Sequence, residues 1–75
     1  MFQNNGFEII LSSDIDYEHL CAEIYFNGEF VAIITQEMGI ENAKIDFESR
    51  KNNLKWNFSL SELLAILEKA KDHLR

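Results

Sequence analysis

Five stretches of this chain alternate apolar and polar residues or concentrate β-branched and aromatic ones, which is the pattern of half-buried β-strands. They are residues 7–11, 20–26, 29–35, 43–48 and 54–58. Polar runs separate most of them, and no proline interrupts any because the chain contains none. The pattern therefore predicts about four to five short strands that follow one another along the chain.

The dipeptide Asn27-Gly28 stands between the second and third stretches. It favours a type I′ hairpin turn, which needs positive φ at both central residues. A two-residue loop places Tyr25 opposite Phe30, and Ile24 opposite Val31, whereas a three-residue loop with a bulge shifts the register by one. In either register both faces of the hairpin are substantially apolar. One face meets the core, and the other needs a cover from the rest of the chain or from a partner.

A helix is predicted over residues 60–74. Ser59 and Glu62 have the spacing of a capping box at its start. An apolar stripe at helical spacing follows, made of Leu60, Leu63, Leu64, Leu67 and Leu74, with Ile66 and Ala70 at its edge. The fold class is therefore α+β: one domain over residues 1–75, an antiparallel β-meander of about four to five strands, and one C-terminal α-helix packed on one face. A single helix leaves the second face of the sheet uncovered.

Size and charge narrow the function classes. A chain of 75 residues holds one domain, and a net charge of −6 argues against direct binding of nucleic acid or of an anionic membrane surface. No apolar stretch approaches the roughly 18 residues of a membrane span. Cys21 is the only cysteine, and Met1–Phe7 carries no secretory signal, so we expect a cytoplasmic protein with Cys21 as a small apolar strand residue.

The charge is unevenly distributed. Residues 1–48 contain ten acids and one base, whereas residues 49–75 contain three acids and six bases. A dispersed acidic surface can simply keep a small protein soluble. Alternatively, the acidic region can steer and hold a cationic partner. The sequence leaves both interpretations open.

No pattern in the sequence indicates catalysis or a bound metal. Asp14, Asp16 and Glu18 resemble the start of a calcium loop, but His19 stands where that loop needs glycine and Tyr25 where it needs glutamate. One cysteine and two distant histidines give no zinc spacing, and no nucleophile elbow or glycine-rich phosphate loop is present. We therefore expect no enzyme activity, no catalytic residue, no metal and no cofactor.

The runs SSDIDYEHL (residues 12–20) and AEIYFNGEFVA (residues 22–32) resemble a group of short acidic bacterial proteins. Some members of that group look like immunity proteins of contact-dependent inhibition and other polymorphic toxin systems. The likeness covers about residues 7–48, and the C-terminal helix matches in type only. It implies a protein that binds and blocks a cognate toxin domain, and it transfers no functional residue by position.

The function expected is a protein-binding inhibitor of the immunity type, which neutralises a cationic toxin domain by steric and electrostatic occlusion, with a nuclease as the favoured toxin class. From charge and expected exposure, the candidate partner-binding residues are Asp14, Asp16, Tyr17, Glu18, Glu23, Tyr25, Glu29 and Phe30. Two alternatives stay open. One is a phage-type acidic mimic of nucleic acid that inhibits a host nuclease complex, and the other is a small structural homodimer that pairs through its sheet.

Overall fold

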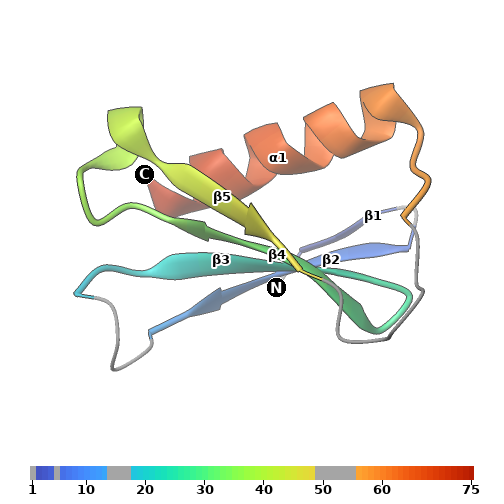
Figure 1. Ribbon diagram of the computed structural model, residues 1–75, viewed down its shortest axis with the longest axis horizontal. Coiled ribbons are helices and arrows are strands. Elements are labelled where there is room, and N and C mark those ends of the chain that lie inside the picture. Colours follow the sequence, from blue (N-terminus) through green and yellow to red (C-terminus); the bar gives the residue numbers. More distant parts are fainter. Residues whose placement is uncertain (1, 5, 14–17, 49–55) are drawn as a thin grey trace.

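The computed structural model describes residues 2–4, 6–13, 18–48 and 56–75, with side chains described from residue 6 onward. Its elements are β1 (Phe2–Asn4), β2 (Phe7–Ser12), β3 (Cys21–Phe26), β4 (Glu29–Thr35), a 3-10 turn η1 (Ile40–Asn42), β5 (Lys44–Phe47) and α1 (Leu60–Leu74). The strands form one antiparallel sheet in chain order, and α1 lies along one side of it (Figure 1). The predicted α+β meander with a C-terminal helix is confirmed.

The hairpin between β3 and β4 turns through two residues, as predicted. Asn27 and Gly28 have φ of 50° and 85°, the positive values that a type I′ turn needs. Tyr25 accordingly pairs with Phe30.

One step farther from the turn the predicted register is wrong. A bulge lies between Tyr25 and Ile24, so Ile24 pairs with Ala32 instead of Val31. The extra residue allows Val31 and Ala32 both to be buried in the core, because a bulge opposes two residues to one.

The core lies between α1 and the sheet, with α1 packed mainly over β2 and β3. The sheet contributes Phe7, Ile9, Ala22, Ile24, Val31, Ala32 and Ile34, and the helix contributes Ile66, Ala70 and Leu74. Because residues on one face of a strand alternate, these positions fix which side of each strand meets the helix. The helix-side surface over β4 and β5 is consequently less covered.

The start of α1 is confirmed, and its buried stripe is only partly the predicted one. The Ser59 hydroxyl accepts a hydrogen bond from the Glu62 amide at 3.4 Å. Leu60 and Leu64, placed in the stripe by sequence, are 70% and 52% exposed. The buried residues are Ile66, Ala70 and Leu74, with Leu63 and Leu67 partly buried. These five positions follow one side of the helix, about a quarter turn from Leu60 and Leu64.

The predicted strand over 54–58 is wrong in its described part, since residues 56–58 form no strand; Leu54 and Lys55 lie outside the described residues. Trp56 and Phe58 stack with ring centroids 5.2 Å apart, and Phe58 also packs on Phe7 and Phe26 at 5.0 and 5.1 Å. Their alternation therefore reflects a cluster of rings at the end of the core, not pairing in the sheet. Strand β1 was not predicted because its three residues carry no alternating pattern.

Candidate partner-binding surface

The side of the sheet turned away from α1 is called the outer face here. Its described residues are Glu8, Ile10, Ser12, Cys21, Glu23, Tyr25, Phe30, Ile33, Thr35, Lys44 and Asp46. Within the described ranges no helix or strand lies over this face (Figure 1). It combines acids, two aromatic rings and aliphatic side chains, so it is the candidate surface for a partner.

The Glu23 carboxylate is the centre of the polar contacts on the outer face. One of its oxygens accepts a hydrogen bond from the Tyr25 hydroxyl at 2.7 Å, and the other accepts one from the Ser12 hydroxyl at 2.8 Å. Both are charge-assisted bonds, which are stronger than bonds between neutral groups. Glu23 therefore holds side chains of two adjacent strands in place.

Tyr25 is held at its ring as well as at its hydroxyl. Its ring meets the Phe30 ring edge to face, with centroids 5.5 Å apart and planes at 80°. Tyr25 remains half-buried, whereas Phe30 is only 6% exposed. Phe30 therefore supports Tyr25 and offers little surface of its own. A tyrosine fixed in this way would lose little side-chain entropy on binding a partner.

Aliphatic and acidic residues alternate across the strands beside this pair. Ile10 pairs with Glu23, Glu23 with Ile33, and Ile33 with Asp46. In the neighbouring row Glu8 pairs with Tyr25. Cross-strand partners lie about 5 Å apart, so the acids stand directly beside apolar side chains. This composition suits a partner that presents both cations and apolar groups.

The chain around residues 18–20 is fixed by the segment that follows β4. The two carboxylate oxygens of Glu37 accept hydrogen bonds from the amides of Glu18 and His19 at 2.8 and 3.0 Å. The Gln36 side chain donates to the Leu20 carbonyl at 2.9 Å. The bond from the Glu18 amide is the main cause that lowers the pKa of Glu37, and the His19 amide adds to it.

The predicted contact residues are only partly brought together. Glu23, Tyr25 and Phe30 share the outer face, and Glu18 is exposed on the loop held by Glu37. Glu29 pairs with Phe26, whose ring is in the core cluster, so the register places Glu29 on the helix side. Asp14, Asp16 and Tyr17 lie outside the described residues.

The sequence did not predict several residues of the outer face, nor Glu37, which holds the chain around residues 18–20. Glu8, Ile10 and Ser12 lie opposite Tyr25, Glu23 and Cys21. The alternation of residues 7–11 could have identified Glu8 and Ile10, because it places them on the side of the strand opposite to Phe7 and Ile9. No comparable signal in the sequence pointed to Glu37. Cys21 lies on a strand as expected, but it is fully buried, and its thiol donates to the His19 carbonyl at 3.6 Å.

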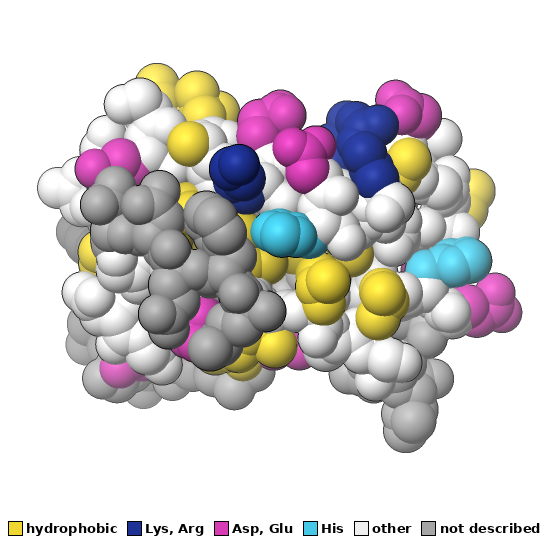
Figure 2. Space-filling view, turned by 180° about the vertical axis from the view of Figure 1, so that it is seen from behind, with side chains coloured by type: hydrophobic (Ala, Val, Ile, Leu, Met, Phe, Trp, Pro, Cys, Tyr) yellow, Lys and Arg dark blue, Asp and Glu magenta, His cyan; other side chains and the backbone are white. Residues whose placement is uncertain are grey.

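Acids do not gather into a continuous patch on the side of the molecule in Figure 2. There, acidic, basic and hydrophobic side chains are interspersed. Among the described residues no group of three or more histidine, cysteine or acidic side chains is placed to hold a metal ion. No described helix is long and apolar enough to cross a membrane.

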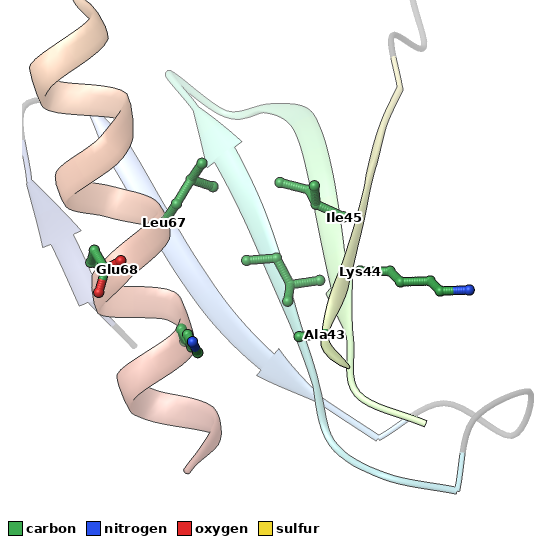
Figure 3. Close-up of a pocket in the computed structure, with 7 residues that line it drawn as sticks. Ala43, Lys44, Ile45, Leu67 and Glu68 are labelled. Carbon is green, nitrogen blue, oxygen red and sulfur yellow. The ribbon is translucent and has the colours of Figure 1, made fainter. Parts of the chain in front are cut away.

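A small apolar pocket lies on the helix side, between β5 and α1. It is lined by Ile34, Ala43, Lys44, Ile45, Leu67, Glu68 and Lys71, and its volume is about 180 Å³. Ile45 and Leu67 point toward each other across it, whereas the Lys44 side chain points away (Figure 3). Small-molecule sites usually have at least about 300 Å³. The pocket is therefore better matched to one side chain of another protein than to a metabolite.

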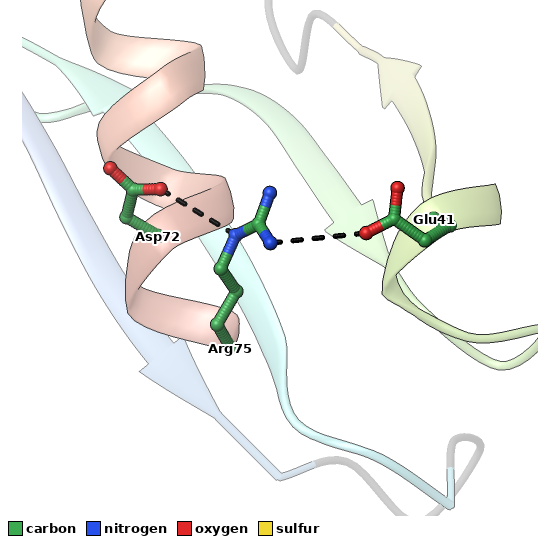
Figure 4. Close-up of polar contacts among 3 residues, drawn as sticks. All are labelled: Glu41, Asp72 and Arg75. Atoms are coloured by element: carbon green, nitrogen blue, oxygen red, sulfur yellow. Dashed lines mark ion pairs between the residues drawn. The ribbon is translucent and has the colours of Figure 1, made fainter.

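Arg75 connects the end of α1 to the turn η1. Its guanidinium lies 3.8 Å from a Glu41 carboxylate oxygen and 3.6 Å from one of Asp72 (Figure 4). All three side chains are more than half exposed. Such ion pairs contribute little to stability, on the order of 1 kcal/mol or less.

Comparison of the chain with protein-family models, with curated proteins and with solved structures finds no match.

Proposed function

We propose that this protein acts by binding another protein, as an immunity-type inhibitor that blocks a cationic toxin domain. The observation that carries the proposal is the outer face, where an ordered tyrosine stands among acids and aliphatic side chains and no described element covers it. The resemblance of residues 7–48 to immunity proteins supports the same class. The proposal assigns no catalytic residue, because an occluding protein needs none.

In this mechanism the acids and the tyrosine have separate roles. Glu8, Glu23 and Asp46 would attract a cationic surface and speed its approach. Tyr25, held by Glu23 and Phe30, would provide the contact that slows dissociation, since ordered aromatic residues dominate many interfaces. Ile10 and Ile33 would exclude water around it.

A nuclease is the toxin class that we favour. Nucleases need basic surfaces to hold phosphates. An acidic partner can occupy such a surface and keep the substrate away. The mimic of nucleic acid would instead need a continuous acidic surface, whereas the described acids of the outer face alternate with aliphatic and aromatic residues.

The proposal is tested with the product of the gene directly upstream of this one in its native genome. That product is expressed in a bacterial host with and without this chain, and growth and direct binding are measured. We expect the chain to restore growth and to bind. Tyr25→Ala should weaken binding by about tenfold or more, as expected for loss of an anchoring aromatic residue.

A charge-matched pair of variants locates the contact. Glu23→Gln removes one negative charge from the outer face and loosens Tyr25, whereas Glu62→Gln removes one from the exposed first turn of α1. We expect weaker binding for Glu23→Gln and unchanged binding for Glu62→Gln. Equal effects of the two variants, or growth inhibition that the chain fails to relieve, would refute the proposal.

A further inference from the structure

Strand β5 is the last strand of the sheet, and one of its two edges points away from β4. The Glu48 amide donates to the Val31 carbonyl at 2.8 Å. Because hydrogen-bonding groups alternate along an antiparallel strand, the backbone groups of Asp46 and Lys44 also point to β4. Those of Ile45 and Phe47 point outward, where the described part of the chain provides no strand to pair with them.

The side chains of β5 are unusual for a strand at an edge. Exposed edges are protected by short length, by charged side chains, by proline or by a charge on the core side; β5 is short and carries Lys44, but it has neither proline nor a charge on the core side. Here the core-side residues are Ile45 and Phe47, which pair with Ile34 and Ala32 of the core. Phe47 is 55% exposed. This edge has free hydrogen-bonding groups and an apolar helix side, so it is suited to a further strand.

We propose that the further strand is β5 of a second copy of this chain, antiparallel to the first about a twofold axis. The outer-face charges select the register. Centring the pair on Lys44 would oppose Lys44 to itself, and centring it on Asp46 would oppose two aspartates. Centring it on Ile45 places Lys44 opposite the partner's Asp46 twice, once on each side of the axis.

The same register gives a partner to three of the four outward-pointing backbone groups of Ile45 and Phe47 and leaves only the Phe47 carbonyl without one. The two copies of Ile45 exchange hydrogen bonds with each other, because both point outward. The Phe47 amide of each copy reaches the partner's Ala43 carbonyl. The Ala43 amide already donates to Ile40 at 3.3 Å, so only the Ala43 carbonyl is available to the partner. Charge, backbone and symmetry therefore all agree on one register.

The pocket between β5 and α1 gives the exposed Phe47 a place to bind. In the register centred on Ile45, the partner's Phe47 lies opposite Ala43, which lines that pocket. Alanine leaves room for the ring, and Ile45 and Leu67 provide apolar walls (Figure 3). Each copy would bury the Phe47 ring of the other, which is the self-complementary contact that a twofold interface requires.

The dimer is independent of the proposed inhibitor role. A twofold axis perpendicular to the sheet places both helices on one side and both outer faces on the other. The two five-stranded sheets would become one, and the contact between the copies would not use the outer face. The paired strands are only four residues long, so the association should be weak and dependent on concentration.

Variants that reverse the charge of Lys44 or of Asp46 test the dimer and its register. Sedimentation equilibrium of the full chain should show a monomer–dimer equilibrium. Lys44→Asp and Asp46→Lys each replace two attractive pairs by two repulsive ones, and each should weaken the dimer by about tenfold or more. An equimolar mixture of the two variants should dimerise again, because one variant then presents two acids at these positions and the other presents two lysines.

Amide hydrogen exchange locates the interface. At high protein concentration the Ile45 and Phe47 amides should be protected in the wild type, and this protection should be lost in either single variant. A chain that stays monomeric at every concentration would overturn the inference. So would a dimer that neither variant weakens, or one that the mixture fails to restore, since the copies would then meet through another surface.

Discussion

At the scale of single residues, Glu37 shows how one side chain can position a loop without being buried. Its carboxylate accepts hydrogen bonds from two consecutive amides, those of Glu18 and His19. Both bonds are stronger to the ionised form, which explains why they lower the pKa of Glu37 from its ordinary value of 4.5. The position of exposed Glu18, one of the predicted contact residues, depends on this interaction.

A lowered pKa in the folded protein means that Glu37 stabilises the fold above the pKa of the unfolded chain. This contribution is lost as the pH falls through the lower, folded value. In an NMR titration we expect the Glu37 carboxyl signal to titrate below 4.5, with the Glu18 and His19 amide signals moving at the same midpoint.

Glu37→Gln should remove the pH dependence of those amide signals, because the amide group of glutamine does not titrate. Glu48→Gln removes the same charge from an exposed residue that directly follows β5 and serves as the control. A Glu37 midpoint at or above 4.5, or amide signals that titrate equally in the Glu37→Gln variant, would show that this carboxylate does not hold the loop.

At the scale of the elements, α1 separates two aliphatic residues that the sequence placed together. Ile66 is 1% exposed and belongs to the core, whereas Leu64 is 52% exposed. Ile66→Ala should lower the free energy of unfolding by about 2–5 kcal/mol, because it leaves a cavity in the core. Leu64→Ala should change it by about 0.5 kcal/mol or less.

Urea unfolding followed by the fluorescence of Trp56 measures both variants, since this is the only tryptophan and it stacks on Phe58. If Ile66→Ala fails to fold, Ile66→Val provides a milder test, with an expected loss of about 0.5–1.5 kcal/mol. Equal losses for Leu64→Ala and Ile66→Ala would instead support the leucine stripe predicted from the sequence.

The elements also show which parts of the fold can be predicted from local chemistry. The cap at Ser59 and the turn at Asn27-Gly28 depend on a few adjacent residues, and both were predicted correctly. The bulge at Val31 and the buried side of α1 depend on how distant elements pack together, which no local pattern encodes. Alternation at Trp56 and Phe58 was misleading because ring packing produces the same spacing as a strand.

As with the fold, only the part of the outer face that depends on adjacent residues could be predicted from the sequence. The Asn27-Gly28 turn predicted that Tyr25 and Phe30 are neighbours on one face of the hairpin. Because a sheet has two faces and one helix was predicted, the helix could cover only the opposite face. The contributions of Glu8 and Ile10 required the pairing of β2 with β3, and the bond network of Glu23 required side-chain geometry. Charge alone had grouped Glu29 with them, whereas the register separates it from them.

At the scale of the whole molecule, the question is whether the location of negative charge matters or only its total. The chain carries a net charge of −6, and ten of its 13 acids lie in residues 1–48. The net charge would attract a cationic partner from any direction, whereas an acidic region on the binding side would also orient it. The two cases differ in the rate of association and not in the fold.

Two triple variants with the same change in charge distinguish these cases. One replaces Asp14, Asp16 and Glu18 with serine, and the other replaces Glu62, Glu68 and Asp72 of α1 with serine. At low salt we expect the first to slow association with the cationic partner by about tenfold and the second to have a much smaller effect.

High salt should remove the difference between the two triple variants, because it screens charges beyond a few ångströms. Stopped-flow measurements at several salt concentrations follow both rates. If the two variants slow association equally, only the total charge attracts the partner, and the loop around Glu18 is not part of the contact. A difference confined to low salt would instead place that loop on the side of the molecule that the partner approaches.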